Sequence, residues 1–413
     1  MAMSSARRLS VLFCCQVFSI SGFKSWADVT ESCLTLLNDG GWHYVRVGVG
    51  TPPQSLDLLV DTGHSGTIVK DCRAMRGDTK KTKCFTGEKS TTYELGGHHI
   101  KLEFGSGNIF GQLGTDVVVV GKSKALMSEG VVFWHSSKGE AFEHAPLEGI
   151  LGLGLPQGKD SALAGSSWLA AASIQRFSMC FSGAEEGGIL RLNPPAAKMR
   201  LGNIGRPANY WALNLQGVSS GDAKAKVAPC GGEKSSDAAC ALIVDSGTQM
   251  ITAPRAQLPD IYSSICDAWP RCKQLMGQRK SSAPESEIKM DKLKAVESLL
   301  EGCQGQEWAT DAAALNKELP PLYWHVGAGG QTETLKLAAS SYVVLIDSGD
   351  KSGPLCYPGI QQMDIQLDAL TGPLIIIGTP LFNEYEVQFD LSTDTISFSP
   401  SSCGSTAQML SVG

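Results

Sequence analysis

Several features that mark common enzyme classes are absent from this sequence. After residue 27 no apolar run reaches the length that spans a bilayer. There is no His-Glu-x-x-His string, no Gly-rich phosphate loop and no Gly-x-Ser-x-Gly motif, which argues against a zinc protease, a nucleotide-binding enzyme and a serine hydrolase. The formal net charge is -6, so no excess of positive charge attracts nucleic acid or an anionic membrane. We therefore expect no metal, no cofactor and no nucleic-acid partner.

The chain does contain a pair of related motifs about half its length apart. Val60-Asp61-Thr62-Gly63 and Val244-Asp245-Ser246-Gly247-Thr248 each close an apolar, strand-like run. In both, a carboxylate stands at the strand end and is followed by a small hydroxyl residue and a Gly that lets the backbone turn sharply. The 413-residue length suits two related β-rich lobes, each contributing one aspartate.

A pair of carboxylates supports chemistry that one carboxylate does not. Two carboxyl groups held close together cannot both ionise freely, so they share a proton and titrate as a coupled unit. The ionised group can then deprotonate a water while the protonated group donates to a carbonyl oxygen. Such a pair can hydrolyse a peptide bond without a metal and without a covalent intermediate.

A third string, Val343–Gly349, has the same local pattern and ends in Asp347-Ser348-Gly349. Only 31 residues separate Asp347 from Gly378, against 133 between Asp245 and Gly378. Because 31 residues are too few for the strands of a lobe, we predict that Asp347 lies at a surface strand end or turn.

These motifs and their surroundings resemble the pepsin-like aspartic proteases over about residues 42–403. Residues 44–54 are similar to that family's strand ahead of the first aspartate, and residues 102–107 to its flap hairpin. Residues 149–153 and 375–378 are similar to the two segments that pack beneath the catalytic loops. The resemblance implies an all-β, bilobal fold around a substrate cleft, with lobes over residues 28–206 and 207–413.

The resemblance also implies roles for individual residues. Asp61 and Asp245 would be catalytic, and Thr62 and Ser246 would brace the two loops against each other. An extended polypeptide would bind as an added strand. The residues implied in substrate binding are Gly63, Phe104, Gly105, Ser106, Gly247 and Thr248. Phe104, Ile68 and Ile150 are expected to form an apolar wall.

Four positions depart from the family pattern. His64 stands where most members have a Ser, and its imidazole could hydrogen-bond Asp61 or rotate out of the site. Phe104 replaces the usual flap tyrosine, and Ile68 replaces the Trp that partners it, so we expect a flap that closes by packing alone. Thr379 stands where many relatives carry an acidic group. Together these changes predict a pH optimum nearer neutral.

Cysteine usage favours an oxidising compartment. The family resemblance suggests three bridges: Cys72 with Cys84, Cys230 with Cys240, and Cys303 with Cys356. Cys180 with Cys403, and Cys266 with Cys272, are further possible pairs, which leaves Cys33 without an assigned partner.

Residues 1–27 combine a basic start, an apolar stretch and a small-x-small cleavage site, the pattern of a signal peptide, with a membrane anchor as the alternative. We expect a monomer without a membrane span in the mature chain, secreted or held in an acidic vesicle or vacuole. Residues 278–302 are expected to form a surface insertion with an amphipathic helix.

The sequence therefore predicts an aspartic endopeptidase that acts on polypeptides. The alternative is a protease-like protein of little or no activity that binds peptides or another protein in the same cleft. A purely structural β-protein would leave the two aspartate motifs unexplained.

Overall fold

The computed structural model describes residues 32–73, 83–139, 142, 147–157, 161, 163–183, 186–205, 209–224, 240–277, 283–328, 330–349, 352–364, 373–403 and 409–411. The predicted signal peptide and Cys230 lie outside these residues. Within them, no helix combines the length and the apolar character needed to cross a bilayer.

Most strands belong to one thirteen-stranded sheet, in the order β11-β22-β21-β9-β10-β1-β2-β3-β8-β4-β7-β6-β5. Its strands are β1 (Ser32–Asp39), β2 (Trp42–Val49), β3 (Gln54–Asp61), β4 (Thr67–Lys70), β5 (Glu94–Phe104), β6 (Gly107–Val120), β7 (Ser123–Lys138), β8 (Gly149–Gly152), β9 (Arg176–Phe181), β10 (Glu186–Leu192), β11 (Leu201–Gly202), β21 (Tyr385–Asp390) and β22 (Thr395–Pro400).

Two further sheets belong to the second half of the chain. The seven-stranded sheet, in the order β16-β15-β12-β13-β20-β14-β19, contains β12 (Ala212–Ser220), β13 (Cys240–Val244), β14 (Ile251–Ala253), β15 (Leu322–Ala328), β16 (Gln331–Leu337), β19 (Ile360–Gln362) and β20 (Leu374–Ile377). The three-stranded sheet contains β17 (Val343–Asp347), β18 (Leu355–Pro358) and β23 (Met409–Ser411).

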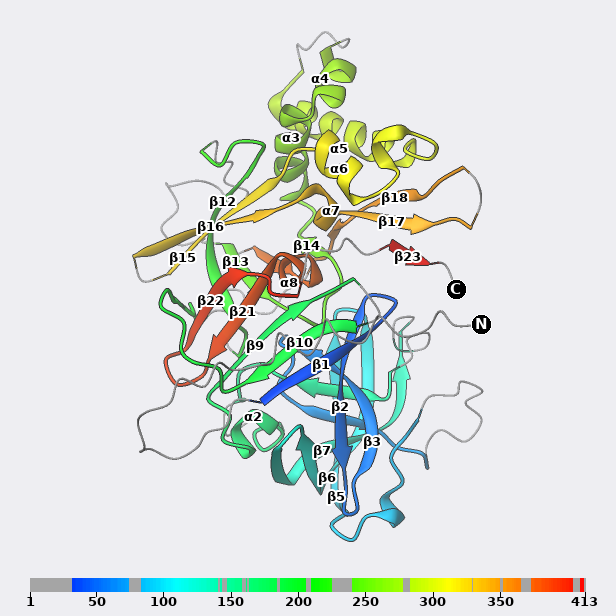
Figure 1. Cartoon of the computed structure of the whole chain (residues 1–413), viewed down its shortest axis with the longest axis vertical. Helices are drawn as coiled ribbons and strands as arrows, with labels where there is room; N and C mark the ends of the chain where they lie inside the picture. Colours follow the sequence, from blue (N-terminus) through cyan, green and yellow to red (C-terminus); the bar gives the residue numbers. More distant parts are fainter. Residues whose placement is uncertain are drawn as a thin grey trace, which may run out of the picture.

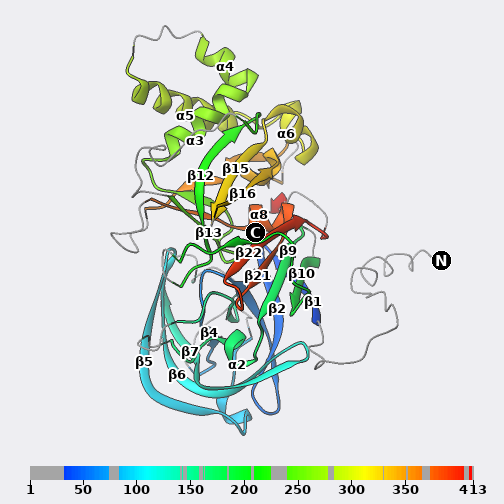
Figure 2. The ribbon, with the colours of Figure 1, turned by 90° about the vertical axis from the view of Figure 1, so that its left-hand side faces the viewer.

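Helices are concentrated at one end of the molecule. Figures 1 and 2 show α3 to α6 at one end and the strands β5, β6 and β7 at the other, with β9, β10, β21 and β22 between them. The helices are α2 (Trp168–Ala171), α3 (Leu258–Ala268), α4 (Pro270–Gly277), α5 (Glu285–Glu301), α6 (Ala312–Glu318), α7 (Ala339–Tyr342) and α8 (Thr379–Glu384), with short 3-10 turns η1 (Gly87–Lys89) and η2 (Glu307–Ala309).

The same three-strand arrangement occurs once beside each aspartate motif. β3 runs parallel to β8, and β8 pairs antiparallel with β4. In the second half, β13 runs parallel to β20, and β20 pairs antiparallel with β14. β8 and β13 are almost wholly apolar and buried at every position, because they are covered on both faces. The chain therefore has the pepsin-like bilobal fold that its sequence predicts, built on two related units.

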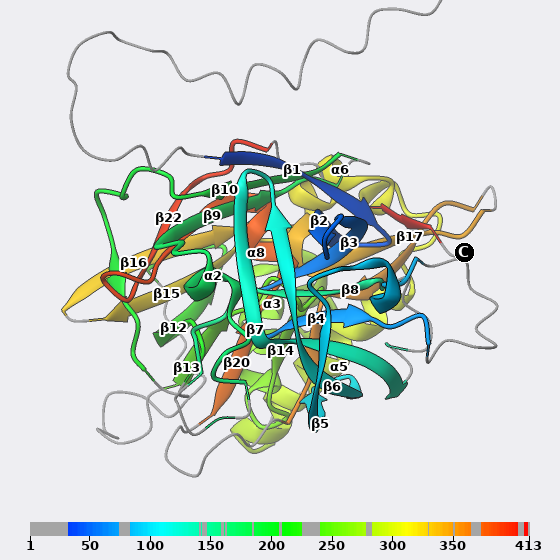
Figure 3. The same ribbon diagram turned by 90° about the horizontal axis from the view of Figure 1, so that it is seen from below.

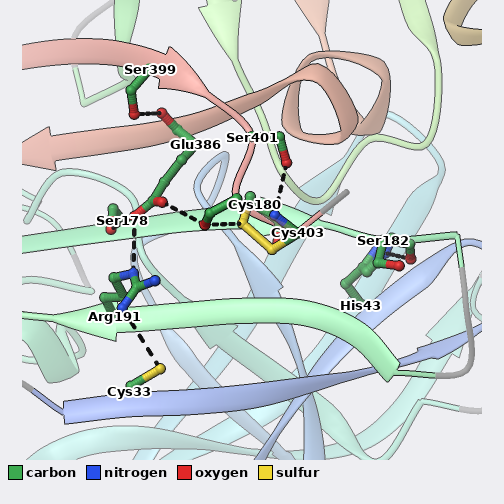
Figure 4. The surroundings of a disulfide bond; sticks show 11 residues. Cys33, His43, Ser178, Cys180, Ser182, Arg191, Glu386, Ser399, Ser401 and Cys403 are labelled. Atoms are coloured by element: carbon green, nitrogen blue, oxygen red, sulfur yellow. Dashed lines mark hydrogen bonds and ion pairs between the residues drawn. A yellow bond between two sulfur atoms is a disulfide. The ribbon is translucent and has the colours of Figure 1, made fainter. Parts of the chain in front are cut away.

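The C-terminal hairpin crosses from the second half of the chain into the large sheet. β21 pairs with β9, with Phe389 opposite Phe177. Their rings stack at 4.9 Å between centroids, and Trp211 packs on both. A disulfide between Cys180 and Cys403 covers the same junction, and Figure 4 shows it beside Ser178 and Glu386. The two halves are thus joined by hydrogen bonds, aromatic packing and a covalent link.

Four predicted cysteine pairs are present as disulfides: Cys72–Cys84, Cys180–Cys403, Cys266–Cys272 and Cys303–Cys356. Cys240 is also disulfide-bonded, but the predicted Cys230–Cys240 pairing lies outside the described residues. Cys33, which the sequence left unassigned, is disulfide-bonded as well. This content of disulfides fits a protein of the secretory pathway.

The predicted amphipathic helix is present as α5. It buries Ala295, Val296 and Leu300 and packs against α3 and β18. Asp347, the third Asp-Ser-Gly motif, ends β17 and is exposed, which confirms the surface strand end.

Candidate active site

Both aspartate loops are held by the strand that runs parallel to their own. The backbone N–H of Leu153, just after β8, donates to the carbonyl of Asp61 at 2.7 Å. In the second half, the N–H of Asp245 donates to the carbonyl of Ile377, the last residue of β20, at 3.0 Å. Gly152 and Gly378 leave no room for a side chain, since a Cβ at Gly378 would lie 1.9 Å from the carbonyl oxygen of Thr248. This lack of space explains why residues 149–153 and 375–378 each place a Gly after apolar residues.

Thr62 and Ser246 connect the two loops symmetrically. The Thr62 hydroxyl donates to the carbonyl of Val244 at 2.9 Å and accepts the Ser246 N–H at 2.9 Å. The Ser246 hydroxyl donates to the carbonyl of Val60 at 2.8 Å and accepts the Thr62 N–H at 3.0 Å. Both side chains are buried, so each hydroxyl satisfies polar groups that water does not reach. The arrangement holds the two loops at a set separation, as the sequence predicts for these residues.

Each loop glycine lies against the aspartate of the opposite loop. A Cβ at Gly63 would lie 2.7 Å from Cγ of Asp245, and one at Gly247 would lie 2.5 Å from Oδ1 of Asp61. No other residue type fits at these positions without displacing a carboxylate. The two aspartates, far apart in sequence, therefore meet in one site.

The carboxylates accept hydrogen bonds from their own loops. Asp61 Oδ1 accepts the N–H of Gly63 at 2.8 Å, and the backbone of His64 also bonds to Asp61. Asp245 Oδ1 accepts the N–H of Gly247 at 2.8 Å, and its Oδ2 accepts the hydroxyl of Thr248 at 2.6 Å. Burial, and then the adjacent charge of Asp245, raise the pKa of Asp61 well above its ordinary value. A carboxyl pair in which one member holds a proton is the arrangement needed for acid–base chemistry.

The predicted flap is an antiparallel hairpin made by β5 and β6, with Gly105 and Ser106 at its exposed tip (Figure 3). Phe104 packs on Phe142 at 5.2 Å and on His64 at 5.1 Å between ring centroids. A Cβ at Gly105 would lie 3.1 Å from Sδ of Met363, in the other half of the chain. The hairpin thus reaches across toward the second half, and its contacts are made by packing, as the Phe at position 104 implies.

The imidazole of His64 does not bind Asp61. Its Nε2 atom is buried with no hydrogen-bond partner among the described residues, and a Cβ at Gly66 would lie 2.7 Å from it. The ring therefore folds back over its own loop and under Phe104. Burial lowers the pKa of the His64 imidazole to about 4. The sequence left open whether His64 bonds to Asp61 or rotates away from it, and the structure shows the ring rotated away.

Two of the expected wall residues lie behind the surface. Ile68 and Ile150 are 0% and 1% exposed and pack in one apolar cluster with Trp134 and Phe142. Phe104 is half-buried and is the member of this set that remains accessible. Ile68 and Ile150 therefore pack in the core behind Phe104 and do not form the apolar wall that the sequence predicts for them.

Residues that no local motif indicates also lie near the carboxylates. Tyr210 is half-buried and packs with Met363 on the apolar cluster that contains Ile376, and burial, with the charges of Asp245 and Asp61, raises the pKa of Tyr210. Met363 and Phe142 contact the flap from distant parts of the chain. Only their position in the fold reveals them. Thr379, in contrast, donates its hydroxyl to the carbonyl of Thr248 at 3.3 Å, and so supports the second loop.

The sequence matches known proteins over almost its whole length. The family model described as eukaryotic aspartyl protease matches residues 43–401. Cathepsin E of Rattus norvegicus is 25% identical over 373 residues, which cover 87% of this chain and 79% of that protein. Cathepsin D of Chionodraco hamatus is 26% identical over 372 residues, covering 86% of this chain and 80% of that protein. With the two braced aspartate loops described above, these matches establish that the chain belongs to the eukaryotic aspartyl protease family.

Proposed function

We propose that this protein is an aspartic endopeptidase that uses Asp61 and Asp245 to hydrolyse peptide bonds. One observation carries the proposal: each loop glycine lies directly against the opposite carboxylate, so the two carboxyl groups face each other without an intervening side chain. Family membership and similarity to cathepsins D and E support the same reaction.

The proposed reaction uses the pair as one acid–base unit. Asp61 and Asp245 share one proton at the start, so that one carboxyl group is protonated and the other is ionised. The ionised group removes a proton from a water, whose oxygen attacks the carbonyl carbon, while the protonated group donates to the carbonyl oxygen. A proton then passes to the amide nitrogen as the C–N bond breaks, which releases an amine and a carboxylic acid. Thr62 and Ser246 keep the two carboxyl groups at the separation this exchange needs.

The substrate is proposed to be an extended polypeptide lying between the aspartate loops and the flap. Gly63 and Gly247, both half-buried, leave backbone groups open to a substrate main chain. Gly105 and Ser106 close over it, and Thr248 lines the opposite side. Phe104 favours an apolar side chain next to the scissile bond.

Cellular placement and architecture are proposed as well. Cathepsin relatives and the disulfides support a mature chain that is secreted or held in an acidic vesicle or vacuole. We place the lobe boundary at residues 206 and 207, between β11 and β12, and infer that the protein acts as a monomer.

The test is cleavage of a quenched-peptide library by residues 28–413, scanned from acid to neutral pH with a pepstatin-type inhibitor alongside. Asp245→Asn should abolish cleavage. Asp347→Asn is the matched control, because Asp347 sits in the same Asp-Ser-Gly sequence and accepts the N–H of Gly349 at 2.9 Å, but is exposed and remote from Asp61. Folded protein that binds the inhibitor and cleaves nothing at any pH would overturn the proposal and indicate a binding protein.

A further inference from the structure

A second pocket lies at the helical end of the molecule, outside the aspartate site. Its volume is about 430 Å³, within the size range of ligand pockets in proteins. Residues of α3, α5 and the strands β18 and β19 form its walls. α5 belongs to the insertion that the sequence predicts between residues 278 and 302, so this insertion contributes one wall of the pocket.

The lining of this pocket, which we call the α5 pocket, is mainly apolar. Leu258, Met290, Leu293 and Ile360 contribute aliphatic side chains. Tyr262 adds its ring, and its hydroxyl already donates to the carbonyl of Ile360 at 2.7 Å, so that group is not available to a ligand. Met290 is 37% exposed, an unusual position for a large apolar side chain at the mouth of a cavity.

One charge in the α5 pocket is left uncompensated. Arg255 also lines the pocket, and its backbone N–H donates to Oδ1 of Asp364 at 3.0 Å; this bond, the amide of Gln362 and the Arg255 charge lower the pKa of Asp364. Glu297 has no cationic partner among the described residues, and burial, with the nearby Glu301, raises the pKa of Glu297. A half-buried carboxylate in an apolar setting favours a cationic group on an incoming ligand.

The α5 pocket is connected to the flap by a short stretch of chain. β19, which forms one wall, ends at Gln362, and the next residue is Met363, the one that faces Gly105 at the flap tip. The N–H of Met363 donates to the carbonyl of Ala253 at 3.0 Å, which fixes this stretch against β14. The pocket wall and the flap contact are therefore about 10 Å or less apart along the strand.

We propose that the α5 pocket is a secondary binding site for the polypeptide substrate and takes a basic residue flanked by apolar residues. The apolar walls bind the flanking side chains, and Glu297 pairs with the ammonium or guanidinium group. The inference rests on the proposed function, because the segment is taken to be part of the same chain that enters the aspartate site. The pocket would give the enzyme a sequence preference at substrate positions beyond those next to the scissile bond.

The experiment measures equilibrium binding to Asp245→Asn protein, so that it does not depend on turnover. The probes are fluorescein-labelled peptides that share one apolar core and carry, at either end, an extension of Leu-Lys-Leu-Lys, Leu-Glu-Leu-Glu or Gly-Ser-Gly-Ser. The Lys extension at one end should lower Kd by about tenfold relative to the Gly-Ser extension, and the Glu extension should not.

Glu297→Gln should remove the gain from the Lys extension and leave binding of the core unchanged. Glu287→Gln is the matched control, because Glu287 is exposed on the first turn of the same helix and does not line the pocket. Equal affinity for the three extensions, or a gain that survives Glu297→Gln, would overturn the inference. Loss of core binding alone would instead count against the proposed aspartate site.

Discussion

At the scale of single residues, the two loop glycines are the most constrained positions of the site. Their constraint is steric: the space that a Cβ would need is taken by the carboxylate of the opposite loop. The hydroxyl residues beside them fix the same geometry by hydrogen bonds. The glycines and the hydroxyls therefore set one quantity, the separation of the two carboxyl groups.

Gly247→Ala should leave the fold intact and strongly reduce activity. The added methyl group would lie 2.5 Å from Oδ1 of Asp61 and must displace that carboxylate. A shift of this kind costs about 100-fold in kcat/KM when the reacting groups depend on exact placement. Gly277→Ala is the control, since a Cβ at Gly277 meets no atom within 4 Å. Activity within a few-fold of the parent would show that the carboxyl groups tolerate a wider separation.

Buried histidines are the second feature at this scale. His43 is 1% exposed and stacks on Phe181 at 3.8 Å, and burial lowers the pKa of its imidazole to about 4. The unfolded chain takes up a proton near pH 6.5 and the folded protein does not until about pH 4. The contribution of His43 to stability is therefore complete above pH 6.5 and is lost as the pH falls to 4, by about 3 kcal/mol in all.

His43→Phe should flatten the pH dependence of stability in acid. The substitution keeps the stacked ring and removes the titrating group. Denaturant unfolding between about pH 4 and about pH 7 should show a smaller loss of unfolding free energy for the variant than for the parent. His99→Phe provides the comparison, since His99 is exposed. Parallel curves for parent and His43→Phe would mean that His43 takes up its proton at the same pH in the folded protein as in the unfolded chain.

At the scale of elements, contacts between aromatic rings, rather than hydrogen bonds, hold the flap hairpin near its tip. Phe104 bridges Phe142 and the loop of the first aspartate through His64. Ile68 beneath it is fully buried and offers no polar group. The hairpin is thus stabilised in its observed position by apolar contacts, whose loss would let it move away from Met363.

Phe104→Ala should raise KM by about tenfold with a smaller change in kcat, because the position that closes over substrate becomes less populated. Amide hydrogen exchange at residues 104–109 should accelerate in the same variant. Phe104→Tyr is the informative control: its hydroxyl finds no partner in the apolar surroundings of Ile68, so no gain in activity is expected. Unchanged exchange in Phe104→Ala would show that strand pairing alone holds the hairpin.

At the scale of the whole molecule, the hairpin of β21 and β22 determines how the halves associate. Although these strands come from the last part of the chain, they extend the large sheet through β9. The Cys180–Cys403 disulfide joins residues 223 apart at this junction (Figure 4). Closing so long a loop restricts the unfolded chain more than closing a short one does.

Replacing Cys180 and Cys403 with Ser should reduce the free energy of unfolding by about 2–4 kcal/mol. The Cys266–Cys272 disulfide, with a separation of 6 residues, is the control, and its removal should cost less. Both variants should be compared by denaturant unfolding. An equal loss in the two would indicate that native contacts, not loop closure, account for the effect of these bridges.

Local chemistry in the sequence was enough to predict both aspartate loops, the β-rich fold and an amphipathic helix within residues 278–302, whereas the flap was predicted by family resemblance. Each of these depends on residues close together in the chain: an apolar strand, a carboxylate and a Gly, or an apolar face with helical spacing. Five disulfide pairs were also proposed, three of them by family resemblance, because cysteine spacing alone does not determine connectivity, and four of the five are present among the described residues.

Only the tertiary structure decided matters that depend on which distant surfaces meet. It placed His64 under Phe104 instead of on Asp61, buried Ile68 and Ile150 behind the wall, and brought Tyr210 and Met363 to the site. Asp347 differs in this respect: its spacing to Gly378 already distinguished it from Asp245, and the structure confirms that it is an exposed strand end. Strand ends and turns follow from neighbouring residues, whereas contact, burial and pKa depend on the packing of segments far apart in the chain.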